Sequence, residues 1–154
     1  MNGAKADNLR LLKDNGINVP DFVVIPSDGS YDGTILKPDK TYAVRSSCSL
    51  EDGNDFSFAG QFDTFLNVPA DDVNTKIKEC FASMRTPNVA EYAISNNITM
   101  ADIRMNVIVQ EMVLSDMSGV LFTANPKGIL NESVITVGRG LGDGVVSDKV
   151  DTTS

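Results

Sequence analysis

Two short stretches decide the fold of this chain: VRSSCS at residues 44–49 and FAGQFDT at residues 58–64. In the first stretch, an apolar run ends at Arg45 and is followed by hydroxyl side chains. In the second, Ala59 and Gly60 precede another apolar run. A guanidinium presents a rigid fork of donors to phosphate, and a glycine lets backbone N–H groups approach the same oxygens. These residues indicate a polyphosphate site on neighbouring strands; the alternative is a salt-bridged surface arginine beside an ordinary hairpin glycine.

The composition is that of one folded domain. The chain has 154 residues, of which 42% are hydrophobic and 22% are charged, values typical of a globular protein with a single core. No apolar run reaches the roughly 20 residues that cross a bilayer, and no secretion signal is visible. We therefore expect a cytoplasmic protein that has no membrane partner.

Charge and the lack of histidine exclude several functions. The formal net charge of −8 argues against nucleic acid as a partner, because such a surface repels phosphate backbones. A small anion such as ATP can still bind where cations are concentrated or a metal is present. The sequence contains no histidine, which excludes Ser-His-Asp and Cys-His catalysis, phosphohistidine relays and imidazole-dependent zinc sites within this chain.

The first part of the chain predicts a helix, two strands and a loop. Leu9 and Leu12 share one face of a helix over residues 5–15, and Gly16 stands where a left-handed cap is expected. The next segments are a buried strand, a loop and a strand that leads to Arg45: residues 22–25, 27–40 and 42–44.

Helical spacing begins near residue 70. Asp71 or Asp72 can cap a helix with a continuous apolar stripe. The stripe consists of Val73, Ile77, Cys80, Phe81 and Met84. We expect Cys80 to be a core residue rather than a nucleophile, and we expect both cysteines to be reduced. A further helix starts with Pro87 in its first turn and runs to about residue 96.

The last third predicts β structure. Apolar strands are expected at residues 105–113, 118–124 and 133–137. The glycine-rich residues 138–144 are expected to lead into a strand at 145–147. A dinucleotide fingerprint needs a helix there, and no Gly-Lys-Ser/Thr exists for a P-loop, so neither motif is assigned. The order of elements predicts an α+β fold with two lobes, residues 1–67 and 68–154.

Four ordered segments resemble the N-terminal ATP-grasp domain of the phosphoenolpyruvate synthase and pyruvate phosphate dikinase family, which rifampicin phosphotransferases share. They are GAKADNL at residues 3–9, the pair of stretches within residues 44–64, VQEMV with SGVLFTANP within residues 109–126, and GLGDGVVS at residues 140–147. The resemblance covers nearly the whole chain. It implies an ATP-grasp-like, two-lobed nucleotide-binding domain with a mixed or antiparallel sheet and flanking helices.

The resemblance implies where the phosphates of ATP would bind. Lys5 and Arg45 would hold them, and Gly60 and Thr64 would form the phosphate-facing loop. These are the expected parts, because phosphoryl transfer depends mainly on positioning and on neutralised charge. Taken alone, Lys5 reads equally as a solvated helix lysine.

The adenine would lie at the QEM segment of the third resembling block. Gln110 and Met112 would lie at the base, and Glu111 and Met112 would offer backbone groups to its edge. Met112 is soft and apolar, which suits the face of a purine. Taken alone, Met112 reads as a core residue and Gln110 as a strand residue facing water.

The implied activity belongs to a larger enzyme. In the family, ATP passes a phosphoryl group to a histidine on a separate domain, which hands it to pyruvate or an analogous acceptor. This chain is therefore expected to be the ATP-binding portion of such a phosphotransferase, incomplete at its C-terminal side and inactive alone. The alternatives are a piece of a rifampicin phosphotransferase and a non-catalytic binding module derived from the same fold.

Three departures from the family limit what is carried over. The loop at residues 27–40 stands where the family has a long helical insertion, and Ala4 and Ala6 replace glycines of the opening motif. An acidic metal ligand and a Gln-x-Arg element lie beyond Ser154 in the family. Mg²⁺ is expected with ATP, yet Asp143 alone rarely builds an octahedral site, so no catalytic or metal-binding residue is assigned.

Overall fold

The computed structural model describes residues 4–48, 63–95, 97–99, 103, 105–129, 131–146 and 152–153. The chain forms two compact units, Met1–Met112 and Val113–Ser154. Within the described residues, no helix is long and apolar enough to span a membrane.

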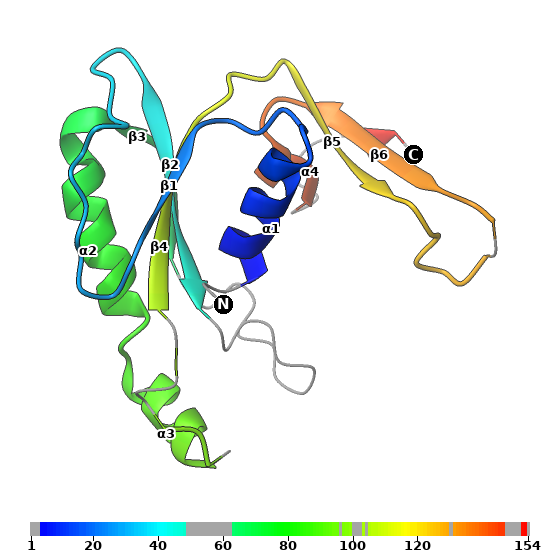
Figure 1. Ribbon diagram of the computed structural model, residues 1–154. Coiled ribbons are helices and arrows are strands. Elements are labelled where there is room, and N and C mark those ends of the chain that lie inside the picture. The colour runs from blue at the N-terminus through cyan, green and yellow to red at the C-terminus, as the bar shows by residue number, and fades with distance from the viewer. Residues whose placement is uncertain are drawn as a thin grey trace. The chain divides into compact units, whose positions relative to one another are not determined.

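The first unit is built on a four-stranded sheet. Its strands are β1 (Phe22–Ile25), β2 (Thr41–Cys48), β3 (Thr64–Pro69) and β4 (Met105–Glu111), in the spatial order β1-β4-β2-β3. All three pairings are antiparallel. Figure 1 shows helix α1 (Ala4–Asp14) on one face of this sheet and helix α2 (Val73–Ser83) on the other.

The main core lies between the sheet and α2. Alternate residues of β2 and β4, including Tyr42, Val44, Val107 and Val109, are buried there. The helix contributes the predicted stripe: Val73, Ile77, Cys80 and Met84 are buried and Phe81 packs against them. Because side chains alternate along a strand, the residues between these, Arg45 among them, belong to the face that α1 covers.

Most predicted elements of this unit are confirmed. Gly16 has φ +76° and lies two residues beyond Asp14, the last residue of α1, and the helix α3 (Pro87–Ser95) begins at its proline. The predicted caps are wrong: Asp71 lies in a 3-10 turn over Ala70–Asp72, and Asp72 makes no side-chain capping bond because it takes helical angles. The turn already continues into α2, so a cap has no place there.

The described residues of the second unit form three antiparallel strands and one short helix. The strands are β5 (Met117–Phe122), β6 (Val134–Arg139) and β7 (Thr152–Thr153), in the order β5-β6-β7. The strand predicted to begin at residue 145 is wrong over its described residues, because Gly142–Val146 form the helix α4, in which Val145 is buried. Ser147 lies outside the described residues. Two adjacent valines are too short a run to distinguish a strand from a buried helical turn. The glycine-rich segment therefore leads into a helix, contrary to the expectation on which a dinucleotide fingerprint was excluded. That fingerprint belongs to a unit with parallel strands, whereas β5 and β6 are antiparallel.

The boundary between the units differs from that of the expected lobes. The expected boundary between residues 67 and 68 falls inside β3, which pairs with β2 on both sides of that point. The compact units divide instead between Met112 and Val113. The reason is that α2 packs its apolar stripe on the first sheet and so joins it.

We expect the Cys80 thiol to resist alkylation in the folded chain. Burial is the main reason that its pKa rises to about 12, so at pH 8 it holds roughly a thousandfold less thiolate than an ordinary cysteine. The test is iodoacetamide labelling of the Cys48→Ala variant, in native buffer and in urea, followed by mass spectrometry. Equal rates in both would contradict the prediction. Because the raised pKa favours the thiol, its contribution to stability is full below the ordinary thiol pKa and is lost as the pH rises toward 12.

Gly119 is expected to be essential for the pairing of β5 with β6. A Cβ atom at this position would lie 2.7 Å from the Thr136 carbonyl oxygen and 3.0 Å from Val137 Cγ1. The carbonyl is backbone and cannot rotate away, so Gly119→Ala should destabilise the second unit by about 1–3 kcal/mol. Amide hydrogen exchange in β5 and β6 measures the loss. Gly142→Ala is the matched control, because its Cβ would meet only Ser118 Cβ at 3.8 Å; similar losses in both variants would refute the steric argument.

Candidate functional site

The candidate site lies on the face of the first sheet that α1 covers. Arg45 stands in the middle of β2, opposite Thr64 on β3 and Ile108 on β4. Directly paired residues of antiparallel strands project to the same face. Arg45 and Thr64 are therefore neighbours, as the sequence predicted for adjoining strands.

The helix α1 brings Lys5 to the same place. The Lys5 ammonium donates a hydrogen bond of 3.4 Å to the carbonyl oxygen of Ser46, the residue after Arg45. The first turns of α1 thus place a second cation beside the Arg45 strand position. Ala4 and Ala6 lie in the helix, and neither has a left-handed backbone. Alanines in place of the glycines of the family's opening motif are therefore compatible with this local structure.

The backbone of Arg45 is paired with β3 on one side and with β4 on the other. Its side chain is half-buried, and among the described residues no hydrogen bond or ion pair engages it. Thr64 is exposed at the start of β3. A half-buried guanidinium that no described residue engages is a candidate to bind an anionic ligand. Gly60, the remaining predicted phosphate contact, lies outside the described residues.

The predicted adenine contacts lie at the end of β4. Gln110 pairs with Ala43 of β2, two positions along from the Arg45 pairing, so it shares the sheet face of Arg45. Met112 follows the strand and is partly buried. The structure therefore places Arg45, Thr64 and Gln110 on one sheet face, and Lys5 on the helix that covers this face.

Glu111 is placed differently from its neighbours. It lies on β4 opposite Tyr42, whose side chain is in the core on the other face. Its N–H donates to the Asp21 carbonyl at 2.8 Å, and the Met112 N–H donates to the Thr41 carbonyl at 2.9 Å. Both N–H groups are thus engaged within the first unit. The carbonyl groups of these two residues are therefore the backbone candidates for contact with an adenine base.

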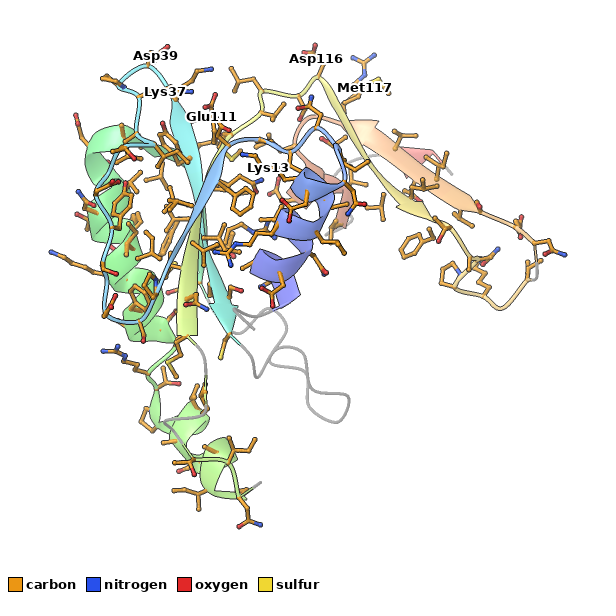
Figure 2. The ribbon with its side chains drawn as sticks, viewed as in Figure 1. Lys13, Lys37, Asp39, Glu111, Asp116 and Met117 are labelled. Atoms are coloured by element: carbon orange, nitrogen blue, oxygen red, sulfur yellow. The ribbon has the colours of Figure 1, made fainter. Side chains whose placement is uncertain are left out.

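The Glu111 carboxylate forms ion pairs with two lysines of the loop before β2. Lys37 Nζ lies 3.2 Å from Glu111 Oε2, and Lys40 Nζ lies 2.9 Å from Glu111 Oε1. Lys37 and Glu111 are labelled in Figure 2. Asp21 adds ion pairs with Lys13 at 3.5 Å and with Lys37 at 4.0 Å. We name Asp21, Lys37, Lys40 and Glu111 the strand-end cluster.

These ion pairs shift the titration of their members. Hydrogen bonds from Lys40 and then Lys37 lower the pKa of the Glu111 carboxyl, and the bond to Glu111 raises the pKa of each lysine. Because the pKa of Glu111 is lowered, the cluster stabilises the fold fully at pH values above the ordinary glutamate pKa. This stabilisation is lost as the pH falls through the lowered pKa of Glu111. The raised pKa values of Lys37 and Lys40 give a stabilising contribution that is full below the ordinary lysine pKa and is lost as the pH rises through the raised values.

Sequence reasoning missed the strand-end cluster. Lys37 and Lys40 flank a Pro-Asp pair in a polar loop, and Glu111 follows 74 residues after Lys37. Only the register of β2 against β4 brings them together. Two lysines beside a turn are a common surface pattern, so no local signal pointed to this pairing.

The described residues do not fit a magnesium site. They contain no group of three or more acidic, cysteine or histidine side chains that could hold a metal ion. Asp143, the one carboxylate of the glycine-rich segment, lies at the start of α4. A magnesium ion needs near-octahedral oxygen ligands, so no step is assigned to a metal on these residues.

Fold and site together define a class: an α+β domain whose sheet carries cations and polar groups on one face, suited by charge to an anionic ligand. Comparison with known proteins identifies the family. Residues 30–154 match the model of the pyruvate phosphate dikinase AMP/ATP-binding domain. This chain belongs to that family.

Curated relatives support the assignment. The chain is 44% identical over 110 residues to phosphoenolpyruvate synthase of Pyrococcus furiosus, covering 70% of this chain and 14% of that protein. It is 45% identical over 112 residues to rifampicin phosphotransferase of Streptomyces sviceus, covering 71% and 13%. Over an alignment 185 positions long, it is 34% identical to the uncharacterized phosphotransferase YvkC of Bacillus subtilis, covering 96% of this chain and 22% of that protein. The chain thus spans less than a quarter of the length of each.

Proposed function

We propose that this chain is the ATP-binding part of a phosphotransferase similar to phosphoenolpyruvate synthase, with an ATP-grasp-like mode of binding. The observation that carries the proposal is the pairing of Arg45 with Thr64 on adjoining strands, with the Lys5 ammonium bonded at the next residue. The triphosphate lies over these groups, with Gly60 contributing from outside the described residues. The adenine lies at Gln110 and Met112.

The charges on this face suit a triphosphate. The whole chain is acidic, with net charge −8, so an anion binds only where cations are concentrated. The Arg45 guanidinium supplies a fork of donors and Lys5 supplies a point charge. Their role is to bind and orient the phosphates and to neutralise charge, which is most of what phosphoryl transfer requires.

The acceptor of the phosphoryl group lies outside this chain in the proposal. No histidine is present in the sequence, so a phosphohistidine relay needs another domain, from which the group would pass to pyruvate. Magnesium would accompany ATP and partly neutralise its charge, and the described residues supply no ligand set for it. We further propose a cytoplasmic location, with no nucleic-acid or membrane partner.

Calorimetric titration of the chain tests the proposal. We expect ATP with Mg²⁺ to bind at a single site, and tripolyphosphate and adenosine each to compete for it more weakly, because each occupies one half. Absence of binding by ATP would refute the proposal. Binding of tripolyphosphate alone, without an effect of adenosine, would refute the adenine half.

A rifampicin phosphotransferase part is the second candidate, favoured by the relative from Streptomyces sviceus. Both candidates share the ATP site and differ in the acceptor. Fusion of the chain to the remaining domains of each relative, followed by assay with pyruvate and with rifampicin, distinguishes them. A non-catalytic binding module predicts instead that a protein partner is retained equally by wild type and Arg45→Ala without ATP.

A further inference from the structure

Three separate segments converge on residue 111. Its backbone N–H bonds the residue before β1, through the Asp21 carbonyl at 2.8 Å. Its carboxylate bonds the loop before β2, through Lys37 and Lys40. Asp21 in turn pairs with Lys37 at 4.0 Å and with Lys13 of α1 at 3.5 Å, which links the last turn of that helix to the same point.

The Glu111 carboxylate is better shielded than an ordinary surface acid. Its side chain is 17% exposed, against 52% for Lys37 and 43% for Lys40. Isolated exposed pairs contribute little, but one shielded carboxylate with two cationic donors forms a network with more defined geometry. Asp39 adds a further charge near Lys40. The lysine ends remain in solvent, so the network is sensitive to salt.

The loop that supplies the lysines is itself fixed to the sheet. The Lys37 N–H donates to the Tyr42 hydroxyl at 2.7 Å, and that hydroxyl donates to the Ile35 carbonyl at 3.0 Å. Tyr42 is fully buried. The two lysines therefore start from an anchored backbone and hold Glu111 from a fixed position.

The residues on either side of Glu111 are the proposed adenine contacts. We propose that Glu111 is a positioning residue: the strand-end cluster fixes the end of β4, and thereby keeps Gln110 and Met112 where a nucleotide base meets them. The inference rests on the proposed ATP-binding function and deepens it. Its side chain does not touch the ligand; it acts through the backbone that it holds.

The first measurement does not involve a nucleotide. The Glu111 and Met112 amides donate to Asp21 and Thr41, so their hydrogen exchange reports opening of the strand end. In Glu111→Gln we expect both amides to exchange about threefold to tenfold faster. The difference should shrink in about 1 M salt, where the wild-type ion pairs are screened. Glu79→Gln, which breaks the 2.7 Å pair with Lys76 on α2, is the matched control and should leave both amides unchanged.

The second measurement is ATP affinity. We expect Glu111→Gln and Lys40→Met each to weaken binding about threefold to tenfold, and the double variant to lose no more than either, because both break one network. Faster amide exchange with unchanged ATP affinity would overturn the positioning role. Unchanged amide exchange would overturn the strand-end cluster itself. If wild type binds no ATP, the proposed function fails and the positioning role falls with it, while the amides still report whether the cluster holds the strand.

Discussion

Replacing Arg45 by alanine is expected to weaken ATP binding roughly tenfold to a hundredfold while the fold is retained. A hydrogen bond to a charged group contributes about 1.5–3 kcal/mol, which sets this range. The fold should survive, because the guanidinium engages no partner among the described residues and the β2 backbone keeps its pairing. Calorimetric titration gives the affinity, and thermal unfolding checks the fold.

Two further variants make the Arg45 result specific. Arg45→Lys keeps the charge and loses the fork, so its loss should be smaller than that of alanine. Arg85→Ala removes an exposed arginine that reaches the Ser27 carbonyl at 3.4 Å, away from the site, and should bind ATP as wild type does. Equal affinity of wild type and Arg45→Ala would reject the phosphate site.

Replacing Tyr42 by alanine is expected to destabilise the first unit by about 3–5 kcal/mol. The side chain is fully buried between the sheet and α2, and removal of a buried aromatic ring leaves a cavity as well as lost apolar contact. Urea unfolding followed by circular dichroism measures the change, with the slope compared between variants. A loss below about 1 kcal/mol would contradict the packing described for this core.

The Tyr42 hydroxyl can be tested separately. Tyr42→Phe leaves the Lys37 N–H and the Ile35 carbonyl without their partner, at a cost of about 1–3 kcal/mol. Tyr31→Phe is the matched control, since the Tyr31 hydroxyl is buried and has no hydrogen-bond partner among the described residues. Its removal should be neutral or slightly stabilising, because no bond is lost.

Sequence patterns predicted the first unit well where periodicity was long. The α2 stripe and the strand that carries Arg45 each combine several apolar positions with a clear period, and both are confirmed. The short run at residues 145–147 has no period to measure, and its sequence predicts a strand, although Val145 and Val146 belong to the helix α4. The unit boundary also escaped prediction, because it depends on which sheet α2 packs against.

The candidate site was predictable in its residues and not in its geometry. The resemblance drew attention to Arg45, Thr64 and Gln110, and the structure places them on one sheet face. It also implied that Glu111 and Met112 offer backbone groups to the base, and the structure shows that the N–H group of each is already bonded within the first unit. Strand register decides such details, and a register is a property of pairing over long sequence separations.

The strand order has a consequence for how the first unit is made. The strand β4 lies between β1 and β2, although 79 residues separate Ile25 from Met105 in numbering (105 − 25 − 1). On the ribosome, β1 lacks its partner in the described sheet until the chain has been synthesised through β4. Topologies dominated by such distant pairings fold slowly. Nascent β1, and the edge of β2 that later pairs with β4, therefore expose unpaired backbone N–H and C=O groups until β4 has been synthesised.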